Sequence, residues 1–146
     1  MELEAQGLSF EEIVPAIDSF RDNIKTYFVI DNLDTFIKNG RVSKLKGTIA
    51  STLNIKPILT GVNGEIEQIG QALGINKAIN QLIETVRSKH AGDKDNRIII
   101  THCNCPDRAQ KAATALEAIT AEEILMLPMR GVSTMYANDG GLIITI

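Results

Sequence analysis

The sequence predicts one domain built from both helices and strands. Its 146 residues are the size of a domain with a single core, and no repeat or change in composition marks a linker. Hydrophobic patterns typical of helices and of strands alternate along the chain, and an Asn-Gly pair between two strand-like segments predicts a hairpin. Because only 4% of the residues are aromatic and Trp is absent, we expect an aliphatic core.

The N-terminal segment predicts a helix and then a strand. Ser9-Phe10-Glu11-Glu12 has the spacing of a capping box, so a helix begins there. We expect a kink or a restart near Pro15, which has no N–H to donate. Residues 26–30 are β-branched and aromatic, and Asp31-Asn32 ends this run, which predicts a strand.

Two helices are expected next. A short helical pattern covers residues 33–38, and Gly40 suits the end of that helix. Ser43 suits the cap of a second helix. The second helix has one apolar stripe, formed by Leu45, Ile49 and Leu53.

A hairpin and a long helix occupy the middle of the chain. Residues 55–60 and 65–69 predict two strands, and Asn63-Gly64 between them supplies the positive φ angles of a tight turn. A helix of about four turns follows and closes at residues 91–93. Its apolar residues recur at helical spacing: Ile75, Ala78, Ile79, Leu82, Ile83 and Val86.

The last part predicts three strands and one helix. The run Ile98-Ile99-Ile100 within the strand 97–103 is apolar on both faces, which predicts a central place in the sheet. Segments 123–129 and 142–146 predict the last two strands, separated by a loop over residues 130–141. Pro106 suits the first position of a helix whose one side carries Ala109, Ala112, Ala113 and Leu116.

Charge and composition exclude several classes of function. The formal net charge is −3 and aromatic residues are few, so the chain lacks the basic surface and the stacking platforms of nucleic-acid-binding proteins. No apolar run reaches the ~20 residues of a membrane span, and the N-terminus does not have the pattern of a signal peptide. We predict a cytoplasmic protein with no membrane span and no nucleic-acid partner. Cys103 and Cys105 are expected to be reduced thiols.

Residues 102–105 hold a cluster of side chains with metal-binding or nucleophilic chemistry. Strand alternation puts His102 on the face opposite Cys103 and Cys105, so the three could share a metal only if the strand ends inside the motif. No positive charge adjoins the thiols except Arg108. We favour a structural role and predict no metal and no cofactor; a metal site and a redox or nucleophilic cysteine are the alternatives.

Two segments are candidates for binding an anion. Gly40-Arg41-Val42-Ser43-Lys44 combines the free N–H groups of a helix start with a guanidinium, although an ordinary helix cap fits the same residues. Segment 131–141 contains Ser133, Thr134 and three glycines, and a long loop between strands is usually functional or disordered. A polar surface loop has the same composition. No motif for a nucleophile elbow, a Walker loop or a carboxylate pair is present.

Three stretches, 27–33, 38–44 and 53–59, carry a resemblance to a known family. Its most specific part is the step Gly40-Arg41-Val42-Ser43 followed by Leu53-Asn54-Ile55-Lys56-Pro57-Ile58-Leu59. On these residues the chain resembles the DegV family of bacterial fatty-acid-binding proteins, from near Ser9 to its C-terminus. The resemblance implies an α+β fold of two layers, with a largely antiparallel (mixed) sheet covered by helices.

The resemblance also implies that the chain is half of a larger protein. Members of the family carry a preceding α/β domain that supplies Thr and Ser hydroxyls to the fatty-acid carboxylate, and the acyl chain lies in a tunnel between the domains. We therefore expect residues 1–146 to be a single domain, the C-terminal half of such a protein. Residues 1–8 are expected to be a linker or the start of a truncated chain, with Met1 as an added initiator.

The head-group residues are implied by the same resemblance. Arg41 and Ser43 match the family's Gly-Arg-Ile-Ser step, which lies near the ligand head group. Gly131, Ser133 and Thr134 match its C-terminal glycine-rich head-group loop. Many members have His-Thr-Gly-Pro-Gly where this chain has Ser-Thr-Met-Tyr-Ala, so Ser133 takes the position of the histidine.

The resemblance predicts binding of a long-chain fatty acid and no enzyme activity. The domain would line one wall of the tunnel and present the fatty acid to the kinase subunit of a fatty acid kinase, although segment 71–77 lacks the basic residues of many members. A kinase-docking interaction domain and a cysteine- or metal-dependent enzyme are the alternatives. The expected acyl-chain contacts, which periodicity alone would assign to the core, are Leu45, Ile49 and Leu53.

Overall fold

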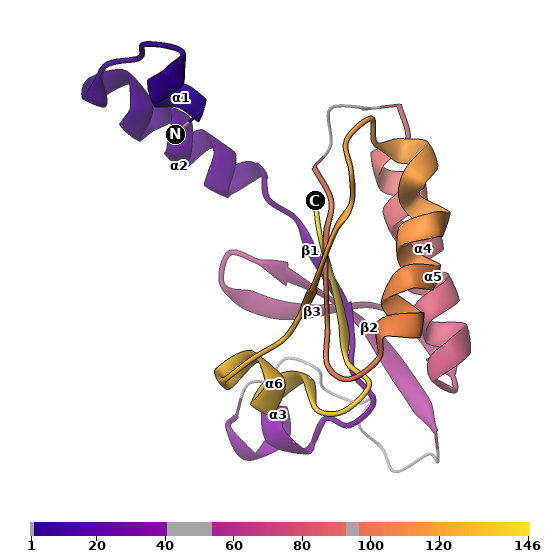
Figure 1. Cartoon of the computed structure of the whole chain (residues 1–146). Coiled ribbons are helices and arrows are strands. Elements are labelled where there is room, and N and C mark those ends of the chain that lie inside the picture. Colours follow the sequence, from indigo (N-terminus) through magenta and orange to yellow (C-terminus); the bar gives the residue numbers. More distant parts are fainter. Residues whose placement is uncertain (1, 41–53, 93–96) are drawn as a thin grey trace.

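The computed structural model describes residues 2–40, 54–92 and 97–146, and over these residues the chain has a two-layer α+β fold (Figure 1). Six strands form one sheet in the order β3-β2-β1-β6-β4-β5. Every neighbouring pair is antiparallel except β4 and β5, which are parallel. The expected fold class, a largely antiparallel sheet covered by helices, is confirmed.

The elements of the structure lie close to the predicted ones. The helices are α1 (Glu2–Ala5), α2 (Phe10–Asn23), α3 (Asp34–Lys38), α4 (Ile75–His90), α5 (Pro106–Leu116) and α6 (Val132–Ala137), with a 3-10 turn, η1, at Glu117–Ile119. The strands are β1 (Thr26–Val29), β2 (Ile55–Val62), β3 (Glu65–Leu73), β4 (Ile99–His102), β5 (Leu125–Pro128) and β6 (Leu142–Thr145). The predicted hairpin is confirmed, since Asn63 and Gly64 have φ angles of 50° and 79° between β2 and β3.

Helix α2 begins at the predicted capping box. The Glu12 carboxylate accepts a hydrogen bond of 2.8 Å from the backbone N–H of Ser9. The helix continues as one element through Pro15, so a restart there is wrong: the proline removes one backbone hydrogen bond without ending the helix. No side chain of α2 is buried, and α1 and α2 extend away from the sheet (Figure 1). None of the described helices is long and apolar enough to cross a membrane.

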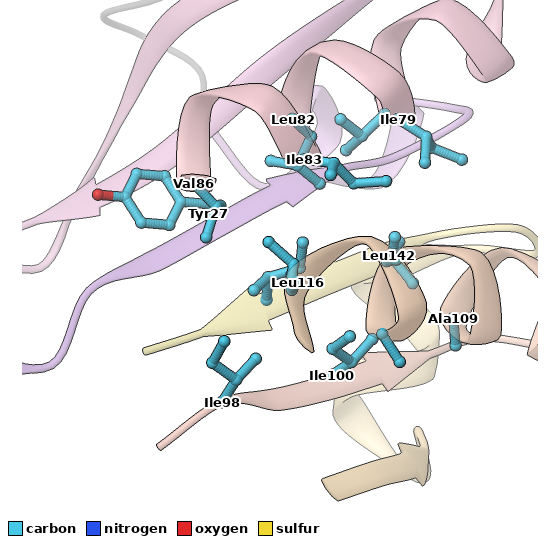
Figure 2. Close-up of a cluster of buried hydrophobic side chains, with 14 of the residues drawn as sticks. Tyr27, Ile79, Leu82, Ile83, Val86, Ile98, Ile100, Ala109, Leu116 and Leu142 are labelled. Carbon is cyan, nitrogen blue, oxygen red and sulfur yellow. The ribbon is translucent and has the colours of Figure 1, made fainter. Parts of the chain in front are cut away.

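The main core lies between one face of the sheet and the helices α4 and α5 (Figure 2). All predicted apolar positions of α4 except Ile75 are buried, and so are the four predicted positions of α5. The core is aliphatic as expected, and the ring of Tyr27 is its aromatic member. The strand residues that face these helices include Val29, Ile58, Ile100, Leu142 and Ile144.

The opposite face of the sheet has a second, smaller core at one end. Helices α3 and α6 cover this end. Phe36 and Ala137 from these helices pack against strand residues and against Cys103, which follows β4. The strand and strand-end residues in this cluster are Phe28, Ile30 and Leu59.

Farther along the same face, strands β4 and β5 expose apolar side chains. Ile99, Leu125 and Leu127 have exposed fractions of 36%, 50% and 41%. Ile99 is the register partner of Leu125, and side chains alternate along a strand, so these three point to one face. We call them the β4–β5 strip. Strand β4 is internal but lies next to the edge strand β5, so its predicted central place is only partly correct.

Candidate functional site

The structure describes one of the two groups of predicted site residues. Gly131, Ser133 and Thr134 are within the described ranges. The other predicted residues follow α3, which ends at Lys38, and they lie outside the described residues. Their place in the site stays a prediction; they are Arg41, Ser43, Leu45, Ile49 and Leu53.

The segment expected to be a glycine-rich loop contains the short helix α6. Ser133 and Thr134 therefore lie on a helical turn, and the expectation of an irregular loop across residues 130–141 is wrong. Gly131 precedes the helix with a φ angle of 56°, a left-handed conformation that glycine adopts readily. The Ser133 side chain is exposed and that of Thr134 is half-buried, so both are near the surface of the domain.

Contacts with α3 explain why this segment is helical. The Tyr136 ring meets the Phe36 ring edge-on, with 5.2 Å between centroids, and Phe36 stacks on Phe28 of β1 at 6.3 Å. The side-chain amide of Asn138 donates a hydrogen bond of 2.9 Å to the backbone carbonyl of Asn32. These contacts hold the two hydroxyl-bearing residues beside the helix that leads into the predicted arginine segment (Figure 1).

The turn after α6 needs glycine at two positions. Gly140 has a φ angle of 86°, and a Cβ on Gly141 would lie 2.5 Å from the backbone oxygen of Ala137. The turn is tied to the end of β4 by two backbone hydrogen bonds. The N–H of Gly140 donates to the backbone carbonyl of Cys103 at 2.8 Å, and the N–H of Cys103 donates to the backbone carbonyl of Gly141 at 2.9 Å. The end of α6 is thereby fixed to the sheet.

The β4–β5 strip is the part of the candidate site that sequence reasoning missed. Its signal was the apolar run in both strands, 98–100 and 124–127, where a strand with one solvated face would alternate. The run 98–100 predicts a central strand, and no role is predicted for the run 124–127. The structure instead leaves large apolar side chains exposed in a row, the kind of surface that marks a binding site for an apolar ligand or a partner.

The cluster at residues 102–105 has the geometry of a strand end. Strand β4 ends at His102, whose Nδ1 accepts a hydrogen bond of 3.3 Å from the backbone N–H of Cys105. Within the described ranges, no group of three His, Cys, Asp or Glu side chains could hold a metal ion. Burial raises the pKa of both thiols, which keeps them protonated and weakly nucleophilic at neutral pH. These observations favour the structural role.

Together, these features define a class of protein: a two-layer α+β domain with an open apolar sheet face and a short hydroxyl-bearing helix at the end of that face. The chain belongs to the DegV family. The model of that family, described as uncharacterised protein of the DegV family, matches residues 1–145. The resemblance drawn from the sequence is confirmed.

Curated relatives of this chain include proteins from streptococci. A DegV domain-containing protein of Streptococcus pneumoniae is 35% identical over 141 residues, which are 94% of this chain and 49% of the relative. One from Streptococcus gordonii is 32% identical over 144 residues, which are 97% of this chain and 50% of the relative. The chain spans about half the length of the curated relatives it matches.

Solved structures of the family are similar over nearly the whole chain. A DegV family protein from Ruminococcus gnavus, refined with vaccenic acid, has a TM-score of 0.88 and 37% identity, covering 99% of this chain and 52% of that one. The Fatty Acid Kinase (Fak) B3 protein of Streptococcus pneumoniae, loaded with linoleic acid, has a TM-score of 0.84 and 33% identity, with 99% and 51% covered.

Proposed function

We propose that this chain is the fatty-acid-binding C-terminal half of a two-domain DegV protein. The observation that carries the proposal is the β4–β5 strip, an apolar sheet face open to solvent among the described residues. Similar structures hold vaccenic acid and linoleic acid, and this chain covers about half of each, which supports the proposal. A preceding domain would close over the open face and complete a tunnel for the acyl chain.

The route from the strip to the predicted head-group segment runs along β4. Because side chains alternate along a strand, Ile99, Thr101 and Cys103 point to the same face. Cys103 forms backbone hydrogen bonds with the turn after α6. At about 3.3 Å per residue, these four steps span roughly 13 Å. An extended acyl chain along this line would have its methyl end over the strip and its carboxylate at the end of the sheet that α6 covers.

The proposal assigns roles to each group of residues. The Arg41 guanidinium neutralises the carboxylate through charge-assisted hydrogen bonds, and the hydroxyls of Ser43, Ser133 and Thr134 donate to it, beside Gly131. The β4–β5 strip contacts the acyl chain. In this proposal the segment that follows Arg41, which the sequence predicts to be helical, adds the contacts of Leu45, Ile49 and Leu53.

The domain carries its ligand in the cytoplasm and does not transform it. The Fak B3 protein, named for a fatty acid kinase, supports a kinase subunit as the partner that phosphorylates the bound fatty acid. The raised pKa of the Cys103 and Cys105 thiols supports a role without catalysis. A pull-down of the kinase subunit with wild type and with Arg41→Ala tests the partnership. If neither protein recovers the kinase subunit, the partnership is contradicted.

The binding proposal is tested on the full-length protein that contains this chain. Lipid extraction and mass spectrometry of the purified protein should find a long-chain fatty acid. Leu127→Asp on the strip should weaken binding roughly tenfold, because it replaces about 1.5 kcal/mol of apolar burial with a charge. The matched control is Leu73→Asp at the opposite edge of the sheet, where Leu73 is 59% exposed. A wild type without fatty acid, or equal losses in both variants, contradicts the proposal.

A further inference from the structure

We propose that Arg108 is a positioning residue, whose guanidinium holds the turn after α6 in the conformation that binds the ligand. Its effect on ligand affinity rests on the proposed function, whereas the contact itself is a property of this chain. Arg108 lies in the first turn of α5, 32 residues before Gly140 in the sequence. Neither the motifs nor the predicted site residues include it as a contributor to binding.

The contact joins a charged donor to a backbone acceptor in a buried turn. The Arg108 Nη1 donates a hydrogen bond of 2.8 Å to the carbonyl oxygen of Gly140, and Gly140 is buried. A Cβ on Gly140 would lie 2.5 Å from this same nitrogen. The missing side chain at Gly140 is therefore what allows the guanidinium to approach. Hydrogen bonds from a charged donor are stronger than those between neutral groups.

The guanidinium shares a small pocket with acidic side chains. Arg108 and Gly140 line a pocket of about 330 Å³ together with Asp31 and Asp139. Asp31 follows β1 and forms an ion pair of 2.6 Å with Lys56 of β2. Arg108 thus lies where the end of β1, the start of α5 and the turn after α6 meet.

Hydrogen bonds carry the restraint from Gly140 back to the predicted site. The N–H of Gly141 donates to the backbone carbonyl of Asn138 at 3.2 Å, and the N–H of Asn138 donates to the backbone carbonyl of Thr134 at 3.0 Å. Removal of the guanidinium leaves the buried Gly140 carbonyl without this donor, which favours opening of the turn. The helix that carries Thr134 then loses one of the contacts that fix its end.

The first experiment measures amide hydrogen exchange by NMR in the 146-residue chain. In Arg108→Ala, the amides of Gly140 and Gly141 should exchange roughly 10- to 100-fold faster than in wild type, the range expected for loss of one hydrogen bond from a charged donor. The amides of α4 should be unchanged. Arg108→Lys retains a charged donor and should restore part of the protection. The matched control is Arg87→Ala, which removes an exposed arginine paired with Glu84 on α4.

A double-mutant cycle measures the coupling between Arg108 and Gly140. In Gly140→Ala the new Cβ displaces the guanidinium, so Arg108→Ala should have little further effect on exchange in that background. Full additivity of the two substitutions, or unchanged exchange in Arg108→Ala, overturns the inference.

The second experiment measures fatty-acid affinity in the full-length protein. Arg108→Ala should weaken binding about tenfold without loss of the folded circular dichroism spectrum, Arg108→Lys should recover part of the affinity, and Arg87→Ala should bind like wild type. Faster exchange with unchanged affinity overturns the positioning role, because Arg108 then stabilises the turn without serving the site. A wild type that binds no fatty acid overturns the proposed function instead, while the exchange data still decide the Arg108 contact.

Discussion

The two faces of the sheet differ in how completely they are covered. On one face, α4 and α5 bury Val29, Ile100 and Ile144 to 0% exposure. On the other face, α3 and α6 cover one end, and the described residues leave the β4–β5 strip exposed. Burial of apolar surface contributes about 25 cal/mol per Å², so the open face forgoes stabilisation that the closed face has. The closed face holds the fold together, and the open face is available to something outside it.

The largest expected effect concerns the affinity of the open face for a fatty acid in the absence of the proposed preceding domain. Enclosure of a fatty-acid chain of about sixteen carbons, at ~0.8 kcal/mol per methylene group, contributes about 12 kcal/mol, and a single wall would retain about half of it. The remaining ~6 kcal/mol corresponds to a Kd no better than tens of micromolar, before the costs of association. Isothermal titration of palmitate or oleate into the 146-residue chain should therefore show weak or no binding. A submicromolar Kd would break the comparison between the two faces.

The next effect compares one leucine from each face. Leu82 of α4 is 0% exposed, so Leu82→Ala should lower the free energy of unfolding by about 2–5 kcal/mol through lost burial and a cavity. On the strip, Leu127→Ala should lower the free energy of unfolding by less than about 1 kcal/mol, because much of the Leu127 side chain is already in water. Urea unfolding measures both. Equal losses would mean that the strip is part of the core.

A smaller effect tests how tightly the covered end of the open face is packed. In Gly141→Ala the new Cβ would lie 2.5 Å from the Ala137 oxygen and 2.8 Å from its Cβ, which should cost about 1–3 kcal/mol of stability. Gly61→Ala is the control, since a Cβ there has no neighbouring atom within 4 Å. Thermal unfolding should separate the two variants, and similar midpoints would show that the turn adjusts freely.

The smallest effect is a pH dependence with one contributor from each side of the sheet. Burial raises the pKa of the Tyr27 hydroxyl on the closed face and of the Cys103 thiol on the other. The unfolded chain releases these protons at lower pH, so stability is retained below the unfolded pKa values and decreases as the pH rises above about 9. Urea unfolding at pH 7.5 and 10.5 measures the decrease. Cys103→Ala should reduce it, and a stability that increases with pH would contradict the assignment.

The closed face could be predicted from the sequence because its determinants are local. Helical spacing identified Ala78, Leu82 and Val86 as one buried stripe, and the Asn63-Gly64 turn fixed the pairing of β2 with β3. Such patterns depend on residues close together in the chain, and a single physical rule relates each of them to burial or to a turn.

The open face could not be predicted in the same way. The apolar run at Ile99 indicates that the residue needs cover, but not whether the cover comes from the same domain. The helical form of α6 depends on Tyr136 meeting Phe36, and on a hydrogen bond from Asn138 to Asn32 across 106 residues of sequence. The head-group roles proposed for Arg41 and Ser133 rest on the family resemblance, since their local sequences also fit an ordinary cap and a surface loop.

The edge strand β5 has a further consequence for the behaviour of the protein at high concentration. Ile124-Leu125-Met126-Leu127 is an unbroken apolar segment at a sheet edge, the kind of template on which other chains can add as cross-β structure. Pro128 ends the strand without an N–H for pairing, and Glu122 and Glu123 put negative charge just before it. Charged residues and prolines that flank an apolar strand in this way are gatekeepers, which disfavour addition of further chains to an exposed edge.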